Sequence, residues 1–268
     1  MLNKCAEIWD EVRVKGPLVH CITNYVTVND VANIILAGGA SPAMVESPDE
    51  AGDFARISQA LYLNMGTLTS EQELAMLEAV KGADISGVPI IVDPVACGVI
   101  AHRVELLKKI REHGKIACIK GNGAEIKSLA GIAAQVRGVD SLDAGEGLEP
   151  ACVMLAEKEQ NVVAATGIVD VIADNKQNLA LIKNGSPLFT SITGAGCMVG
   201  GVVSACIGAR PGETWLAVAT GLLAFNIAGE QAAQASGPNP GTFRSRLFDQ
   251  LYQLRGADII QKARVEWR

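Results

Sequence analysis

The chain has 268 residues, of which 49% are apolar and 19% are charged, and its formal net charge is −6. This composition supplies a large core and indicates either one large α/β domain or two small ones. The acidic balance, the lack of a long Lys/Arg run and an aromatic content of 4% argue against a nucleic-acid-binding surface.

The spacing of the cysteines and the first residues of the chain predict the cellular compartment. The seven cysteines contain no CxxC pair, which is typical of reduced thiols in a cytoplasm rather than of disulfides or a zinc site. The first residues are charged and lack a signal-peptide core, and no apolar run reaches the roughly 18 residues of a membrane span. We therefore expect a cytoplasmic protein without a membrane segment.

The N-terminal part of the chain predicts helices that alternate with extended segments. Apolar residues at helical spacing predict helices over 3–14 and 28–36. An extended segment is expected over 17–26 and a short strand or loop over 41–46. Asn24 lies near the end of the first of these, and its amide suits either a ligand or a helix cap. Met44 suits either the wall of an apolar pocket or a core.

Four short apolar runs in the middle of the chain predict buried strands, which cover 60–65, 88–95, 116–120 and 162–166. Between them we expect helices that begin near Thr69 and Gly121, a polar loop or irregular helix over 133–147, and a helix over 149–158. Further on, an antiparallel hairpin is expected at 170–174 and 179–183. The remaining predicted elements are a Gly-rich helix start within 193–208, a helix over 213–234, a turn cluster over 237–244 and a helix over 245–263.

This alternation predicts a single three-layer α/β domain over residues 1–268, with a mainly parallel central sheet and helices on both faces. Ligands bind such sheets beyond the carboxyl ends of the strands. Asp93, Lys120 and Thr166 stand at such ends, and Glu125 follows in the next helical turn. Carboxylate oxygens suit Mg²⁺, and a Lys offsets phosphate charge, although a Glu in a first helical turn also compensates the helix dipole.

The stretch over 193–208 predicts an anion hole at a helix start. Gly194, Ala195 and Gly196 let backbone amides approach a ligand, and the unpaired N–H groups of a helix start favour negative charge. Cys197 stands at its edge, where a helix N-terminus lowers a thiol pKa. The alternative is close packing around an inert thiol. With the strand-end residues, this set matches phosphoryl transfer, and neither Walker A nor GxGxxG occurs.

A series of short motifs runs along essentially the whole chain. They are Ile22-Thr-Asn-Tyr-Val-Thr, Gly39-Ala-Ser-Pro-Ala-Met44, Asn64-Met-Gly-Thr67, Val92-Asp-Pro-Val95, Lys120-Gly-Asn-Gly-Ala-Glu-Ile126, Ala165-Thr-Gly167, Thr193-Gly-Ala-Gly-Cys-Met198 and Pro240-Gly-Thr-Phe-Arg244. With these motifs in this order, the chain resembles the hydroxyethylthiazole kinase family of the ribokinase-like superfamily. The resemblance implies a ribokinase-like fold and transfer of the ATP γ-phosphoryl group to the hydroxyl of 4-methyl-5-(2-hydroxyethyl)thiazole, in thiamine biosynthesis and salvage.

The resemblance also implies roles for single residues. Lys120 and Thr166 correspond to ATP contacts, and Asp93 and Glu125 to the Mg²⁺–phosphate side. Most of the superfamily places an Asp base after the Gly-x-Gly turn, whereas the thiazole kinases place a Cys, so Cys197 either accepts the hydroxyl proton or orients the alcohol. The residues that correspond to the thiazole pocket are Asn24, Met44, Gly66, Thr67 and Gly194.

Two positions depart from the family pattern. Lys120 stands where many relatives have Arg, which keeps the charge but loses bidentate phosphate geometry. Ala96 stands where a Gly is common. Because family members form homotrimers with active sites at subunit interfaces, we expect pocket residues from two chains.

Other functions stay open at this point. A ribokinase-like kinase of a pyrimidine alcohol or sugar and an ATP-dependent dehydratase of the same fold are both disfavoured by Cys197 in place of Asp. A non-catalytic ligand-binding relative is disfavoured by the intact strand-end residues. A cysteine hydrolase is disfavoured because the three histidines form no recognisable Cys/His signature.

Overall fold

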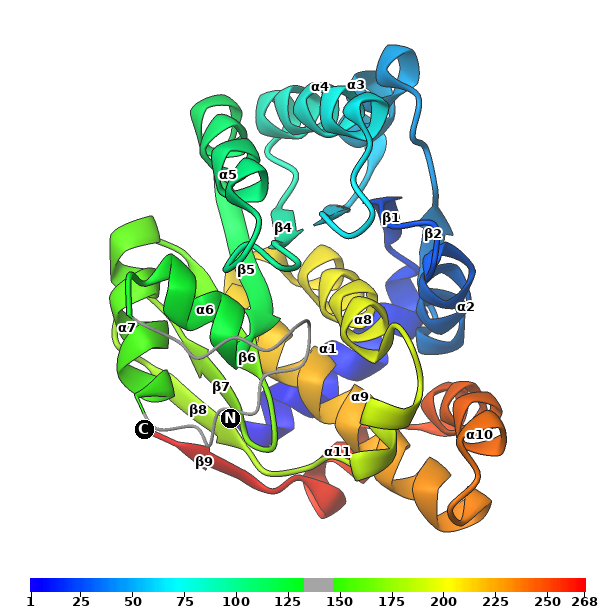
Figure 1. The fold of residues 1–268 in the computed structure, drawn as a ribbon. Coiled ribbons are helices and arrows are strands. Elements are labelled where there is room, and N and C mark those ends of the chain that lie inside the picture. The colour runs from blue at the N-terminus through cyan, green and yellow to red at the C-terminus, as the bar shows by residue number, and fades with distance from the viewer. Residues whose placement is uncertain (133–146) are drawn as a thin grey trace.

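A nine-stranded sheet runs through the computed structural model, which describes residues 1–132 and 147–268 (Figure 1). The strands lie in the order β2-β1-β3-β4-β5-β6-β7-β8-β9, and those from β2 to β6 pair in parallel whereas β7 to β9 pair antiparallel. Their bounds are β1 Leu18–Ile22, β2 Ser41–Ala43, β3 Ala60–Asn64, β4 Ile90–Asp93, β5 Ile116–Asn122, β6 Val162–Thr166, β7 Asp170–Ala173, β8 Leu179–Ile182 and β9 Val265–Trp267. The chain order reverses between β1 and β3, and ligands bind at such a reversal, beyond the carboxyl ends of the strands.

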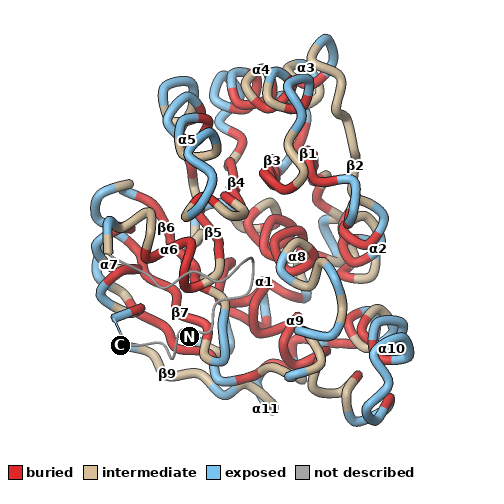
Figure 2. Tube along the Cα trace, in the orientation of Figure 1, coloured by how far each residue is buried: buried red, intermediate tan, exposed pale blue. Residues whose placement is uncertain are grey.

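Helices cover both faces of the sheet. One buried cluster joins it to α1 (Leu2–Lys15), α2 (Val28–Gly38), α8 (Ala195–Ala209), α9 (Thr214–Ser236), α10 (Pro240–Gln253) and α11 (Gly256–Lys262). The other joins it to α3 (Pro48–Ile57), α4 (Ser70–Ser86), α5 (Ala101–His113), α6 (Gly123–Leu129) and α7 (Leu148–Glu159). In β3, Tyr62 faces the first cluster while Leu61 and Leu63 face the second, as the two-residue period of a strand requires. Such a strand is buried on both sides (Figure 2).

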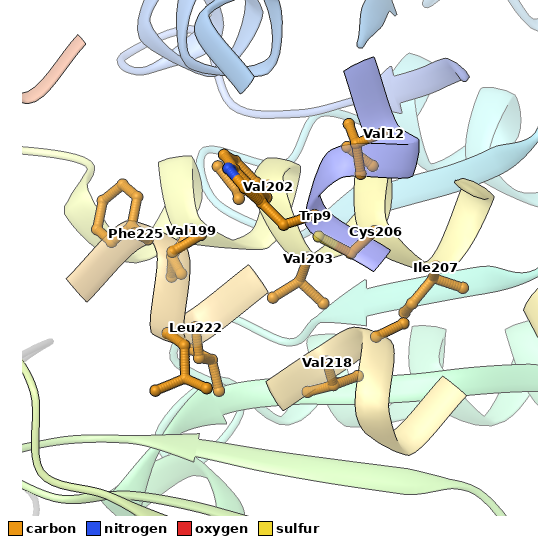
Figure 3. Close-up of a cluster of buried hydrophobic side chains, with 14 of the residues drawn as sticks. Trp9, Val12, Val199, Val202, Val203, Cys206, Ile207, Val218, Leu222 and Phe225 are labelled. Carbon is orange, nitrogen blue, oxygen red and sulfur yellow. The ribbon is translucent and has the colours of Figure 1, made fainter. Parts of the chain in front are cut away.

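The helix α8 lies against β3 because its sequence supplies glycines where the strand side chains project. A Cβ at Gly200 would lie 2.3 Å from the Tyr62 hydroxyl oxygen, so only a glycine permits this approach. On its other sides α8 contributes Val199, Val202 and Val203 to the apolar cluster with α1 and α9 (Figure 3). The packing of its body brings the first turn of α8 to the carboxyl edge of the sheet.

The segment Pro211–Ser236, which includes α9, is long and apolar enough to cross a membrane, by length and composition alone. In the fold, 78% of its most apolar window is buried. A helix that is apolar all round and buried in this way is a core helix.

The predicted strands and most predicted helices are confirmed, but two C-terminal predictions are wrong. The turn cluster predicted over 237–244 ends before Pro240, which begins α10 at a position where the missing proline N–H removes no helical hydrogen bond. The single helix predicted over 245–263 is interrupted by extended backbone at Leu254 and Arg255, which separates α10 from α11.

Within residues 1–132 and 147–268, the elements without a counterpart among the predictions are α3, α5, β9 and two short 3₁₀ helices, Pro187–Ser191 and Pro211–Glu213. The loop or irregular helix predicted over 133–147 lies outside the described residues except for Gly147.

Gly200→Ala tests the close approach of α8 to β3. The added methyl group would displace Tyr62, so the free energy of unfolding should fall by about 1–3 kcal/mol. Gly241→Ala in α10 is the control, because a Cβ there meets nothing within 4 Å. Gly241→Ala should leave the free energy of unfolding unchanged or raise it by up to about 1 kcal/mol. Urea unfolding measures both, and equal stabilities would contradict the packing described.

Candidate active site

Three side chains meet at the reversal between β1 and β3. Asn24 lies just beyond β1, Asn64 ends β3, and Cys197 lies in the first turn of α8. Asn24 Nδ2 donates to Asn64 Oδ1 at 2.9 Å, and each of the two amide nitrogens lies 3.3 Å from Cys197 Sγ. The sulfur therefore accepts hydrogen bonds from two buried amides.

A buried ion pair lies next to this group. Lys120 Nζ is 2.9 Å from Asp93 Oδ2, and the two side chains are only 3% and 4% exposed. Lys120 also donates to the carbonyl oxygen of Gly196 at 2.8 Å. Burial lowers the pKa of Lys120, but the charge of Asp93 and its hydrogen bond outweigh burial, so the pKa is raised and the ammonium stays charged. The ion pair thus joins β4 and β5 to the first turn of α8.

Tyr62 and Asn64 complete the surroundings of Asp93, and neither was given a role from the sequence. The Tyr62 hydroxyl lies 3.2 Å from Asp93 Oδ2 and 3.1 Å from the carbonyl oxygen of Cys197. Asn64 Nδ2 donates to the same carboxylate oxygen at 3.1 Å. The available signal was a pair of polar groups two positions apart in an apolar strand, which places both on one face of the sheet.

The start of α8 has the features of an anion hole. Gly194 has a φ of 80°, and a Cβ there would lie 2.4 Å from Thr27 Cγ2, so glycine is required both for conformation and for space. The first helical hydrogen bond runs from the Met198 N–H to the Gly194 carbonyl at 2.8 Å. The N–H groups of residues 195–197 precede it and so have no acceptor within the helix.

The pKa of the Cys197 thiol is raised, first by burial and then by the charge of Asp93, while Lys120, Thr27 and Asn24 oppose the rise. The net direction is therefore opposite to the lowering expected from a helix N-terminus alone. The physical reason is that a thiolate here would lie in a buried place beside an existing carboxylate. At neutral pH, Cys197 is a neutral thiol.

Glu125 caps α6 and holds the loop after β4. Its carboxylate accepts the Asn122 N–H at 2.7 Å, as part of a capping box, and the Ala96 N–H at 2.6 Å. Burial and then the charge of Asp93 raise the pKa of Glu125 to about 7, against the two backbone hydrogen bonds. Ala96 has a φ of 56°, which explains why a glycine suits this position.

The other predicted residues follow the same edge of the sheet. Thr166 ends β6 and donates to the Gly121 carbonyl at 3.3 Å, on the side away from Asn24. On the Asn24 side, the Gly66 N–H donates to Asn64 Oδ1 at 3.0 Å, and Thr67 Oγ1 accepts the Tyr25 N–H at 3.3 Å. Met44 follows β2 and is half-buried.

The carboxylates fit a magnesium ion that keeps most of its waters. No group of three or more His, Cys, Asp or Glu side chains suited to a metal occurs in residues 1–132 and 147–268. Asp93 Oδ2 already accepts hydrogen bonds from Lys120 and Asn64, and Glu125 accepts two backbone amides. Since Mg²⁺ at phosphates commonly binds through one or two carboxylates, this sparse donor set suits it.

The model of the hydroxyethylthiazole kinase family matches residues 9–257 of the chain. The chain belongs to this family. The hydroxyethylthiazole kinase of Syntrophomonas wolfei is 62% identical over 267 residues, which cover 100% of both chains. The solved structure of a hydroxyethylthiazole kinase protein from Pyrococcus horikoshii OT3 has a TM-score of 0.89 and 32% identity, and the match covers 99% of each chain.

A more distant structure shares the fold alone. The ADP/ATP-dependent NAD(P)H-hydrate dehydratase of Bacillus subtilis has a TM-score of 0.58 at 12% identity, over 90% of each chain. The α/β fold and the phosphotransferase class expected from the sequence are confirmed by the family match and the first two relatives. The family match also favours a hydroxyethylthiazole kinase over the dehydratase and the cysteine hydrolase considered above.

Proposed function

We propose that the chain transfers the γ-phosphoryl group of ATP to the primary hydroxyl of 4-methyl-5-(2-hydroxyethyl)thiazole, in thiamine biosynthesis and salvage. Family membership supports the proposal. The observation that carries it is the position of the α8 N-terminus. The first turn of this helix supplies Cys197 to the Asn24–Asn64–Cys197 cluster and accepts, at the Gly196 carbonyl, a hydrogen bond from Lys120 of the buried Asp93–Lys120 pair.

The alcohol side of the site lies at β1, β2 and β3. We assign the thiazole pocket to Asn24, Met44, Gly66, Thr67 and Gly194, which the loops after these strands and the α8 cap bring to one end of the sheet. Gly66 has no room for a side chain, because a Cβ would lie 3.0 Å from both Asn24 Nδ2 and Asn64 Oδ1. A substrate hydroxyl placed against these amides would lie beside Cys197.

The nucleotide side lies at β4, β5 and β6. The amides of Gly194, Ala195 and Gly196 would hold the charge of the transferred phosphoryl group, since such donors are already oriented toward it. Lys120 lies beneath this turn and would offset that charge, while Thr166 would contact ATP farther along the edge. Because a Lys is a point charge, its position under Gly196 does not depend on the bidentate geometry of an Arg.

Asp93 and Glu125 would hold Mg²⁺ through its waters. A bound Mg²⁺ neutralises charge on the β- and γ-phosphates of ATP. Glu125 would contribute in a second way, because its hydrogen bonds to Ala96 and Asn122 keep the loops after β4 and β5 at a fixed separation.

Cys197 orients the alcohol and does not remove its proton. A thiol with a raised pKa has little thiolate at neutral pH, so it is a poorly populated base. Since the phosphoryl-transfer transition state is loose, positioning contributes more than deprotonation of the nucleophile. The two amides that bond Sγ would fix the thiol in one orientation.

The chain works as a homotrimer with active sites at subunit interfaces. This assignment is supported by Tyr25 and Val26, which are 72% and 52% exposed immediately beside buried Asn24. In a trimer, a neighbouring subunit would cover these two apolar side chains and remove their surface from water. The cytoplasm is the proposed compartment, because all seven cysteines are free thiols in the structure.

An ATP-consumption assay with a panel of alcohols tests the function. The thiazole alcohol should be phosphorylated, with kcat/KM at least about tenfold above those for hydroxymethylpyrimidine and ribose, since the pocket is assigned to that ring. Mass spectrometry of the product would identify the phosphate ester. Phosphorylation of another alcohol but not of the thiazole alcohol would show the substrate assignment to be wrong.

The variant Cys197→Ala distinguishes between two roles of Cys197, orienting the alcohol and removing its proton. We expect kcat to fall about tenfold, with an unchanged pH profile between pH 6.5 and 9, because positioning is lost but no titrating group is removed. Cys206→Ala, farther along the same helix and fully buried, is the control and should keep wild-type kcat. If Cys197 were the base, kcat of the unchanged protein would rise with pH toward the raised thiol pKa, and Cys197→Ala would abolish that rise.

A further inference from the structure

Gln72 holds together the three loops that surround the alcohol side of the site. It is the third residue of α4 and is 7% exposed. Its Oε1 accepts the Thr69 N–H at 3.3 Å, and its Nε2 donates to the Thr23 carbonyl at 3.0 Å and to Glu46 Oε2 at 3.3 Å. These partners belong to the loops after β3, β1 and β2, respectively.

Each of these loops carries a residue of the proposed thiazole pocket. Asn24 is adjacent to Thr23, Met44 is two positions before Glu46, and Thr67 is two positions before Thr69. The strands from which the loops emerge are neighbours in the order β2-β1-β3. A single side chain therefore ties together the three segments that must keep fixed separations if the pocket is to fit one ring.

The role of a helix cap does not account for a glutamine here. In the capping box of α4, the residue at this position only accepts the N–H of Thr69, and a glutamate would do so equally well. The two amide hydrogens of Gln72 are directed instead to two other loops. The loop after β2 has a second contact with His20, whose Nε2 lies 2.8 Å from the Val45 carbonyl oxygen.

We propose that Gln72 is a positioning residue that sets the affinity for the thiazole alcohol and has no part in ATP binding. This inference rests on the proposed function, because it takes the alcohol side of the site as assigned above. The hydrogen-bond partners of the Gln72 side chain all lie on the β1–β3 side, whereas the residues assigned to ATP follow β5 and β6. Loss of its donor bonds should therefore loosen one half of the site and leave the other intact.

Steady-state kinetics of Gln72→Glu tests this separation. The glutamate keeps the cap but loses the donor to Thr23 and repels Glu46 across the same contact. We expect KM for the thiazole alcohol to rise about tenfold, with kcat and KM for ATP within about twofold of wild type. Gln72→Met also removes the Nε2 donor but adds no charge. The same kinetics would be measured on this variant if Gln72→Glu does not fold.

Thr69→Ala is the matched control. It removes the hydrogen bond from the Gln72 N–H to Thr69 Oγ1, so it weakens the start of α4 but leaves the three bonds of the Gln72 side chain. If KM for the thiazole alcohol rose as much in Thr69→Ala as in Gln72→Met, fraying of the helix start would explain both effects. That result would overturn the proposal. An equal rise of both KM values, or an unchanged thiazole KM in folded Gln72 variants, would also overturn it. Inactivity of the unchanged protein toward the thiazole alcohol would instead contradict the proposed function.

Discussion

The buried ion pair of Lys120 and Asp93 is the constraint on which the rest of the site depends. Taking two charges out of water costs several kcal/mol per ion unless close geometry and further hydrogen bonds offset it. Here the offset comes from Tyr62 and Asn64, which approach Asp93, and from the carbonyl of Gly196, which accepts from Lys120. Since these groups belong to β3, β4, β5 and α8, satisfying the pair fixes the helix start relative to three strand ends.

The ion pair also explains why a thiol suits position 197. Asp93 already places a negative charge near the first turn of α8, and that charge contributes to the raised pKa of Cys197. A carboxylate there would add a second buried negative charge beside the first, whereas a neutral thiol adds none. The close fit of Gly200 on Tyr62 and of Gly194 on Thr27 then holds the turn in place. The site thus combines a positive helix end, a neutral thiol and one compensated carboxylate.

Strong local signals were sufficient to predict every strand except β9 and to select candidate site residues, but they did not predict the long-range contacts of those residues. Asp93 and Lys120 were identified because polar groups at the ends of apolar runs are unusual, but their pairing depends on the register of β4 and β5. The spacing of Tyr62 and Asn64 places both on one face of β3, but nothing local indicates that Asp93 and Cys197 are their partners. Gln72 was missed because a polar residue at a helix start gives no local indication of its contacts with other loops. The helix α5 was missed because its mostly polar sequence buries only Leu106, Leu107 and Ile110.

The coupling free energy between Lys120 and Asp93 tests this central constraint most directly. Urea unfolding at neutral pH would compare Lys120→Met, Asp93→Asn and the double variant with the unchanged protein. Lys120→Met should lower the free energy of unfolding by about 3–5 kcal/mol, because it leaves a buried carboxylate unpaired. The decrease in the free energy of unfolding of the double variant should be smaller than the sum of the two single decreases by at least about 2 kcal/mol. Losses that add to within about 0.5 kcal/mol would contradict the claim that the two charges stabilise each other.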